Sequence, residues 1–128
     1  MKLDHIAMYV NDLEKMKEFY IKYFDAKSNL KYQSTRSTLE TYFLSFKGDG
    51  TRLELMTRTD TIDKEKESYR TGYIHMAFNV GNKEKVDKLT ERLRKDGFKI
   101  ISGPRMTGDG YYESCILDPE GNQVEITE

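Results

Sequence analysis

The feature of this sequence that most constrains its fold is an internal repeat with a period of about 70 residues. Residues 1–56 and 73–128 both read as a strand, a helix and three further strands, and the linker 57–72 between them is polar and charged. Solenoid repeats have periods of about 20–50 residues, so this repeat is too long to be one. The sequence therefore predicts a single α+β domain over residues 1–128, built from two βαβββ modules that bury their sheets together.

Alternation of apolar and polar side chains is clearest where each module begins, at residues 3–10 and 73–80. The other predicted strands are residues 26–34, 38–46, 51–56, 98–102, 111–117 and 123–128. Residues 103–114 are rich in glycine and read as a solvated loop or a lid, and "DPEGN" reads as a turn.

Each first strand is followed by an amphipathic helix. In the first helix, Asn11 or Asp12 is suited to cap the N-terminus, and Glu14 lies where a capping box with Asn11 would place it. In the second helix, we expect Asn82 to cap the start and Gly97 to end the helix. The apolar face of each set of strands is expected to pack against these helices.

The composition excludes several classes of function. The chain is 37% hydrophobic and 34% charged, with nine Tyr and six Phe, which is typical of a folded globular protein. Its formal net charge is −1 and no basic block is present, so we expect no nucleic-acid partner. Apolar runs shorter than about ten residues predict no membrane span. The single Cys115 cannot form an internal disulfide and no secretory signal is recognised, so we expect a cytoplasmic protein.

The chain has only two histidines, and they occupy the same position of the two modules. His5 and His75 are 70 positions apart, and Glu54 and Glu125, each four residues after a glycine in "GTRLEL" and "GNQVEI", are 71 apart. All four fall on the polar side of a strand whose other side is apolar, and a lone residue of this kind is more often structural than a ligand. Their coincidence favours a shared cavity if the first and last strands of each module are neighbours.

Two imidazoles and two carboxylates suit one divalent transition metal ion. Nickel, cobalt and zinc fit this donor set, and iron is a weaker candidate. Four protein ligands would leave open positions for water or a substrate, as a catalytic site requires.

The stretches "LDHIAMYVNDLEKMKEFYIKYF", "TRLELM", "YIHMAFNV" and "LDPEGNQVEITE" resemble the vicinal-oxygen-chelate superfamily, and within it the glyoxalase-I-like proteins. The resemblance covers nearly the whole chain. It implies paired βαβββ modules whose strands form a curled, barrel-like mixed sheet around a metal site. It also implies the metal ligands His5, Glu54, His75 and Glu125, and a homodimer in which two chains can share one site.

By the same resemblance, the chain is a lactoylglutathione-lyase-like enzyme that isomerises the hemithioacetal of methylglyoxal and a thiol such as glutathione. A glutamate would move the proton, and we expect Glu125 to be this base, with Glu54 as the other candidate. Tyr9, Arg105 and Tyr111 are candidate contacts for the substrate. By the resemblance, Tyr9 occupies the position at which bacterial glyoxalase I carries an arginine that binds glutathione. The stretch "LELMTRTD" also lacks the aromatic residue that the family usually has beside the end of this glutamate strand. The sequence therefore does not determine the identity of the thiol or of the true substrate.

Three rival functions exist within the same resemblance. A ring-cleaving dioxygenase needs a further histidine, which this chain lacks, and Glu54 would crowd the open side of its iron. A fosfomycin-inactivating thiol transferase uses three ligands, so Glu54 also disfavours that reaction. A metal-free binding or resistance module would not need the four residues, and a purely structural protein would leave their alignment unexplained.

Overall fold

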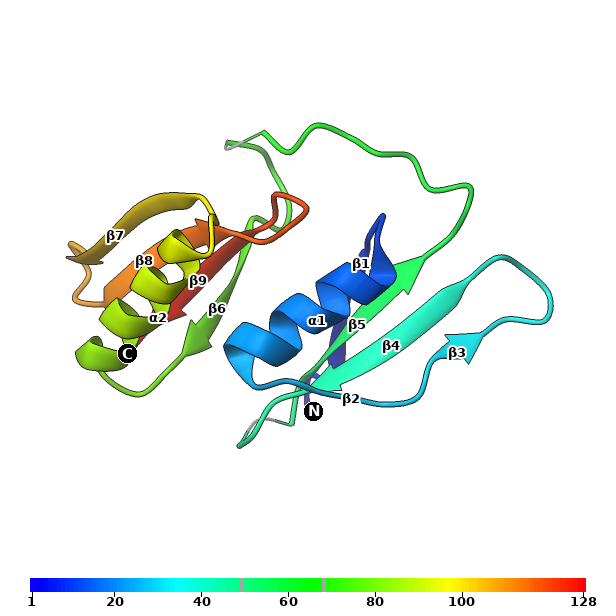
Figure 1. Ribbon diagram of the computed structural model, residues 1–128, viewed down its shortest axis with the longest axis horizontal. Helices are drawn as coiled ribbons and strands as arrows, with labels where there is room; N and C mark the ends of the chain where they lie inside the picture. The colour runs from blue at the N-terminus through cyan, green and yellow to red at the C-terminus, as the bar shows by residue number, and fades with distance from the viewer. Residues whose placement is uncertain (49, 68) are drawn as a thin grey trace. The chain divides into compact units, whose positions relative to one another are not determined.

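The structure of the chain, a computed structural model, describes residues 1–48, 50–67 and 69–128. It divides into two compact units, Met1–Lys64 and Glu65–Glu128, and each unit contains one helix and one mixed sheet (Figure 1). The division falls inside the segment 57–72 that the sequence predicts as a linker.

The elements follow the predicted order in both units. In the first unit they are β1 (His5–Tyr9), α1 (Leu13–Phe24), β2 (Lys27–Ser28), β3 (Tyr32–Gln33), β4 (Glu40–Ser45) and β5 (Arg52–Thr57). In the second they are β6 (His75–Asn79), α2 (Lys83–Lys95), β7 (Ile100–Met106), β8 (Tyr112–Leu117) and β9 (Gln123–Thr127). Both units therefore have the βαβββ order, with the second strand of the first unit split into two short pieces that both pair with β4. The predicted α+β class is confirmed.

The first and last strands of each unit are neighbours and run parallel. The strand order is β1-β5-β4-β2 in the first sheet, with β3 also on β4, and β6-β9-β8-β7 in the second. The pairs β1·β5 and β6·β9 are parallel, and the other pairs in both sheets are antiparallel. A parallel pair needs a crossover connection, which the helix and the intervening strands supply.

One face of each sheet is covered by the helix of its own unit. Helix α1 packs against β2, β4 and β5, and α2 packs against β7, β8 and β9. The side chains buried between them are Leu13, Met16, Phe19, Tyr20, Tyr23, Leu44, Leu53 and Leu55 in the first unit, and Val86, Leu93, Ile116, Val124 and Ile126 in the second. The first strands are less covered than expected, and Ile6 stays 36% exposed because α1 packs over the strands beyond β1. No helix of the described residues is long and apolar enough to cross a membrane.

The start of α1 differs from the predicted capping box. Asp12 is the N-cap and its side chain accepts a hydrogen bond from the backbone N–H of Lys15 at 3.0 Å. The third helical residue is therefore Lys15, and Glu14 cannot complete a box. Glu14 instead accepts hydrogen bonds from Lys17 at 2.8 Å and from the Tyr42 hydroxyl at 3.0 Å, and forms an ion pair with Lys31 at 2.7 Å.

Both predicted ends of α2 are confirmed. The Asn82 side chain accepts a hydrogen bond from the backbone N–H of Lys85 at 3.0 Å, as an N-cap does. Gly97 follows the last turn with φ of +90°, a conformation that glycine adopts without steric cost. The backbone N–H of Phe98 then bonds to the carbonyl of Leu93 at 3.0 Å, which closes the helix C-terminus.

The sequence suggested a continuous loop over residues 103–114, but the structure shows that parts of this segment are strands. Strand β7 runs on to Met106, so Arg105 lies in a strand and pairs with Glu113 of β8. Register shifts on both sides of Ser102 absorb the Gly103-Pro104 dipeptide within this edge strand. A Cβ at Gly103 would meet the carbonyl oxygen of Glu113 at 2.4 Å, so this glycine permits the close approach of the two strands.

Helix α2 is joined to β8 by a buried pair of hydroxyl groups. The Thr90 hydroxyl donates to the backbone carbonyl of Val86 at 2.7 Å and lies 2.6 Å from the Ser114 hydroxyl, and both residues are fully buried. Because the single proton of Thr90 is used on Val86, Ser114 donates to Thr90. Removing the Thr90 hydroxyl therefore leaves Ser114 without its acceptor, whereas removing the Ser114 hydroxyl leaves Thr90 bonded to Val86.

Replacing Thr90 should destabilise the fold more than replacing Ser114. We expect Thr90→Val to lower the free energy of unfolding by about 1–3 kcal/mol, because the buried Ser114 hydroxyl loses its acceptor. Ser114→Ala leaves Thr90 bonded to Val86 and should cost only about 0.5–1.5 kcal/mol. Urea denaturation of both variants and of the double variant measures this, and the double variant should cost less than the sum. A larger loss for Ser114→Ala would contradict the assigned direction of donation.

The cluster around Glu14 should make stability depend on pH in the acid range. Hydrogen bonds from Lys17 and Lys31 lower the pKa of Glu14 from 4.5 to about 2. The folded state thus keeps this carboxylate ionised where the unfolded chain protonates it, so its contribution is complete above pH 4.5 and is lost as the pH falls to about 2. The difference in unfolding free energy between the natural chain and Glu14→Gln should shrink over that range in urea titrations. Glu18→Gln, which removes a carboxylate 3.5 Å from Lys17, is the control and should show a smaller change.

Candidate metal centre

Strand pairing in the first unit brings one histidine and one glutamate together. Ala7 of β1 lies opposite Glu54 of β5, and His5 precedes Ala7 by two residues on the same face of the sheet. The distance from Nε2 of His5 to Oε2 of Glu54 is 3.8 Å. The Glu54 side chain is 16% exposed and the His5 side chain 41%, so the carboxylate is sheltered while the imidazole stays accessible.

The second unit repeats this arrangement in the same register. Ala77 of β6 lies opposite Glu125 of β9, and His75 again precedes the alanine by two residues. Nε2 of His75 is 3.2 Å from Oε2 of Glu125, and the side chains are 38% and 19% exposed. Each unit therefore presents one imidazole and one carboxylate on the sheet face opposite its helix, as the sequence repeat indicates.

The imidazole of His5 has further neighbours in its own unit. Its Nδ1 lies 2.9 Å from Oδ2 of Asp4, and the guanidinium of Arg52 contacts the same oxygen at 2.5 Å. Two hydrogen bonds lower the pKa of the Asp4 carboxyl below its ordinary value, and the one with His5 has a larger effect than the one with Arg52. The ring of Phe43 meets the imidazole edge-on, with centroids 5.4 Å apart.

Different residues surround Glu125. Cys115 of β8 lies directly opposite Glu125 on the same face, and the neighbouring Glu113 forms an ion pair with Arg105 at 3.6 Å. Burial raises the pKa of Glu125, with Glu113 acting in the same direction, while His75 and Arg105 act against it. Burial also raises the pKa of the Cys115 thiol to about 11. In the second unit a thiol and a second carboxylate thus lie near the glutamate, whereas in the first unit the second carboxylate contacts the histidine.

The three predicted substrate contacts lie in different places. Tyr9 is in β1 on the same face as His5 and is 54% exposed. Arg105 lies within electrostatic reach of Glu125 and is 52% exposed. Tyr111 precedes β8 and is 56% exposed, in a turn where its backbone bonds to Thr107. These placements leave the side chains of Tyr9, Arg105 and Tyr111 accessible to a ligand.

The donor set suits a divalent transition metal, because each pair combines an imidazole nitrogen with a carboxylate oxygen. Among residues 1–48, 50–67 and 69–128, no three His, Cys, Asp or Glu side chains converge closely enough to hold a metal ion. Each unit alone therefore offers two donors, and the four-ligand site stays a proposal.

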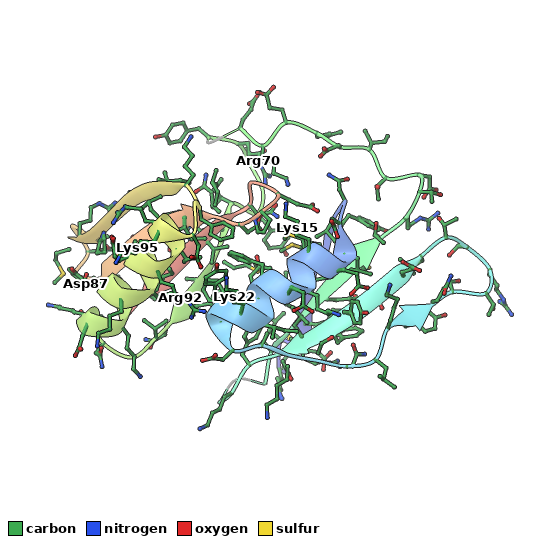
Figure 2. The ribbon with its side chains drawn as sticks, viewed as in Figure 1. Lys15, Lys22, Arg70, Asp87, Arg92 and Lys95 are labelled. Carbon is green, nitrogen blue, oxygen red and sulfur yellow. The ribbon has the colours of Figure 1, made fainter. Side chains whose placement is uncertain are left out.

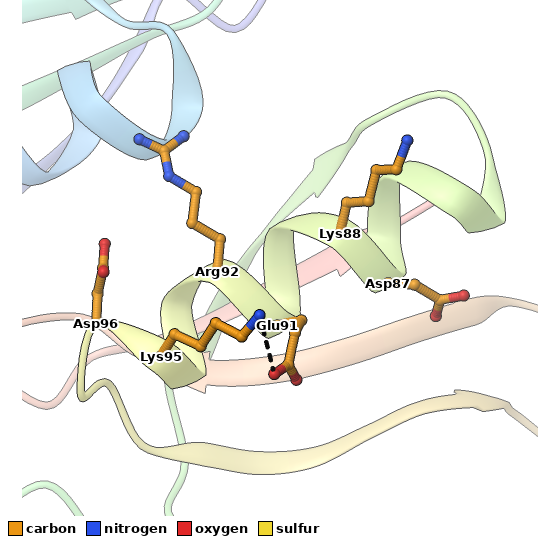
Figure 3. A pocket seen from close by; sticks show the side chains of 6 residues that line it. All are labelled: Asp87, Lys88, Glu91, Arg92, Lys95 and Asp96. Carbon is orange, nitrogen blue, oxygen red and sulfur yellow. Dashed lines mark ion pairs between the residues drawn. The ribbon is translucent and has the colours of Figure 1, made fainter.

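A hollow of about 560 Å³ lies on the surface of α2, and its lining contains none of these four residues (Figure 3). Its lining residues are Asp87, Lys88, Glu91, Arg92, Lys95 and Asp96, and Figure 2 shows Asp87, Arg92 and Lys95 on the same helix. Three acidic and three basic side chains give it no net charge, and Lys95 and Glu91 pair with each other at 4.0 Å. This surface is a solvated helix face and includes none of the predicted site residues.

The sequence did not identify Asp4, Phe43 and Arg52 as part of this region. Asp4 precedes His5 directly, which is a local signal, since ligand histidines commonly donate their second ring N–H to a carboxylate. Arg52 and Phe43 approach through the register of β1, β5 and β4, which no local pattern reveals.

The chain matches the family model of the Glyoxalase/Bleomycin resistance protein/Dioxygenase superfamily over residues 2–126. It is 29% identical to YqjT, an uncharacterized protein of Bacillus subtilis strain 168, over 97% of this chain and 96% of that one. It is 26% identical to lactoylglutathione lyase of Escherichia coli O157:H7, over 100% of this chain and 93% of the enzyme. The trypanothione-dependent glyoxalase I of Leishmania major has the same fold, with a TM-score of 0.79, 22% identity, and coverage of 100% of this chain and 86% of that one.

The chain therefore belongs to the glyoxalase/bleomycin resistance/dioxygenase superfamily, as its sequence motifs predicted. Lactoylglutathione lyases are among its sequence relatives, and a fosfomycin resistance protein of Listeria monocytogenes, solved with Mn(II), shares its fold with a TM-score of 0.75 at 23% identity, so membership alone fixes the fold and not the reaction.

The buried thiol of Cys115 should react slowly in the folded protein. Its side chain is 7% exposed and its pKa is raised to about 11, so both access and thiolate content are low near neutral pH. We expect iodoacetamide to label the native chain much more slowly than the urea-unfolded chain, as followed by intact mass. Equal rates in the two states would show that the thiol is open to solvent.

Proposed function

We propose that this chain is a metal-dependent, glyoxalase-I-like lyase or isomerase that acts on a methylglyoxal-type hemithioacetal or a similar α-oxo compound. One divalent ion, nickel, cobalt or zinc, would be held by His5, Glu54, His75 and Glu125. The carrying observation is that both units bring their histidine and glutamate together through the same strand register.

The surroundings of Glu54 and Glu125 favour metal binding over a purely structural role for these carboxylates. Two sheltered carboxylates, at 16% and 19% exposure, each face an imidazole on the sheet surface that the helix does not cover. Neither Glu54 nor Glu125 forms an ion pair with Lys or Arg among the described residues, so no such ion pair would have to break for either carboxylate to bind a metal ion. Membership of the superfamily and the relation to lactoylglutathione lyase support the same chemistry.

In the proposed reaction Glu125 acts as the base. It takes a proton from the carbon that carries the hydroxyl and sulfur, and the C–H electrons form the C=C bond of an enediolate as the neighbouring carbonyl becomes its oxyanion. Glu125 returns this proton to the second carbon, while the hydroxyl proton of the first carbon moves to the oxygen of the second. The first carbon is left as the carbonyl of a thioester and the second carries a hydroxyl. A divalent ion, when bound, would supply the positive charge that stabilises the enediolate oxygens. Glu54 is the alternative base, but it faces an imidazole fixed by Asp4, whereas the pair of Glu125 and His75 is less constrained.

The substrate contacts would come from the accessible side chains nearby. Arg105 suits an anionic group of the substrate or thiol, and Tyr9 and Tyr111 suit hydrogen bonds or apolar contact. Glutathione is one candidate for the thiol. A homodimer is proposed from the family resemblance, and light scattering coupled to size-exclusion chromatography tests the assembly. A cytoplasmic location is proposed from the single Cys115 and the lack of a recognised secretory signal.

Metal content is the first test of this function. The untagged protein, purified without chelator, should contain nickel, cobalt or zinc by mass spectrometry, at about one ion per four-ligand site. It should then convert methylglyoxal in the presence of glutathione or another thiol. Iron would favour the dioxygenase alternative, and absence of metal after soaking with each ion would favour a metal-free binding module.

Substitution of the two glutamates should separate metal retention from proton transfer. Glu54→Gln should weaken metal binding, because an amide is a poorer ligand than a carboxylate. Loss of a residue that only hydrogen-bonds to a metal ligand typically lowers affinity about 10–100-fold, and loss of the ligand itself should cost at least as much. Glu125→Gln, assayed at saturating metal, should lower kcat by about 10²–10⁴-fold, since it removes the base. Glu40→Gln, a substitution in β4 away from the pairs, is the control. Full activity and metal content in Glu54→Gln would exclude the four-ligand site.

A further inference from the structure

The imidazole of His5 is one member of a closed circuit of four side chains, and the other three are Asp4, Arg52 and Phe43. Asp4 contacts Nδ1 of His5 at 2.9 Å, and Arg52 contacts the same carboxylate at 2.5 Å. The guanidinium of Arg52 lies over the ring of Phe43 at 4.4 Å, and Phe43 meets the imidazole edge-on at an interplanar angle of 86°. Every member of the circuit thus contacts two others, and the circuit spans β4, β5 and the start of β1.

This circuit determines which nitrogen of His5 carries the proton. An ionised carboxylate only accepts hydrogen bonds, so Asp4 requires the N–H of the neutral imidazole to be on Nδ1. The lone pair is then on Nε2, the atom that faces Glu54. The 3.8 Å between Nε2 and Oε2 is longer than an N–H···O hydrogen bond, which fits two acceptors that face each other and leave a place for a cation.

No such circuit surrounds His75 in the described part of the second unit, residues 65–67 and 69–128. The residue before His75 is Ile74, the residue paired with His75 is Gln123, and the residue opposite Glu125 is Cys115. None of these three supplies a carboxylate, and among the described residues the His75 ring has Glu125 as its polar partner, at 3.2 Å from Nε2. The two histidines therefore share a position in the repeat but differ in what orients them.

We propose that Asp4 and Arg52 are positioning residues that fix His5 in the Nδ1–H tautomer and so prepare its Nε2 to bind the metal, while no described residue orients His75 in this way. The tautomer of His5 is a property of the metal-free chain, but its purpose rests on the metal site of the proposed function. Arg52 acts through Asp4, because it holds the carboxylate whose oxygen contacts the imidazole.

The two histidines can be read separately by NMR of the metal-free protein, because the chain has no others. Long-range ¹H–¹⁵N spectra at about pH 8, well above the ordinary imidazole pKa of about 6.5, distinguish the two neutral tautomers. We expect one dominant Nδ1–H tautomer for His5 and a different pattern for His75. Asp4→Ala and Arg52→Gln should shift His5 toward a mixture and leave the His75 signals unchanged. Asp4 is 66% exposed, so its replacement should leave the fold intact.

Metal affinity is the second measurement that tests the role of Asp4. Asp4→Ala should weaken zinc or cobalt binding by about 10–100-fold in titrations, as loss of a partner behind a ligand histidine typically does. The matched control is Asp60→Ala, which breaks an aspartate–arginine pair of the same kind with Arg58 in the same unit, and it should change neither the tautomer nor the affinity.

Two results would overturn the proposal. One is a His5 tautomer that is the same in the natural chain and in Asp4→Ala, and the other is an unchanged metal affinity when the tautomer does shift. A natural chain that binds no metal, yet keeps His5 in the Nδ1–H form until Asp4 is replaced, would instead support the orienting role of Asp4 and contradict the proposed function.

Discussion

Parallel pairing of the first and last strands is the constraint on which both units of this protein depend. It joins the two ends of each βαβββ segment, so that residues about 50 positions apart lie side by side. Because the side chains of a strand alternate between faces, the register that places Ala7 against Glu54 also puts His5 beside that carboxylate. A shift by one residue would turn the glutamate toward the helix, where burying its charge would be costly.

The sequence predicted the elements whose signals are local and periodic. The two helices, the N-cap Asn82 and the order of strands follow from spacing alone, because each is determined by neighbouring residues. The prediction was wrong where tertiary pairing outweighed local preference. Glycine and proline at positions 103 and 104 favoured a loop, but pairing with β8 extends β7 past them, and a bulged edge strand tolerates both.

The candidate site shows the same division between local and long-range information. The repeat was enough to select His5, Glu54, His75 and Glu125, because their equivalence is visible in the numbering. Arg52 and Phe43 were not predictable, since they reach His5 only through the cross-strand register of β1, β5 and β4. A repeat can therefore reveal candidate donors, whereas the groups placed to orient them can be identified only from the structure.

The surroundings of the two pairs have diverged although the pairs themselves have not. Around His5, a carboxylate, a guanidinium and an aromatic ring restrict the imidazole from several sides. Around Glu125, burial and the nearby Glu113 disfavour the charged carboxylate, and the imidazole beside it has no carboxylate behind its Nδ1 among the described residues. A rigid donor pair is suited to holding an ion in place, and a carboxylate whose proton affinity is raised is suited to exchanging a proton. Under the proposed function, this asymmetry would assign proton transfer to Glu125, a choice that the symmetry of the sequence leaves open between the two glutamates.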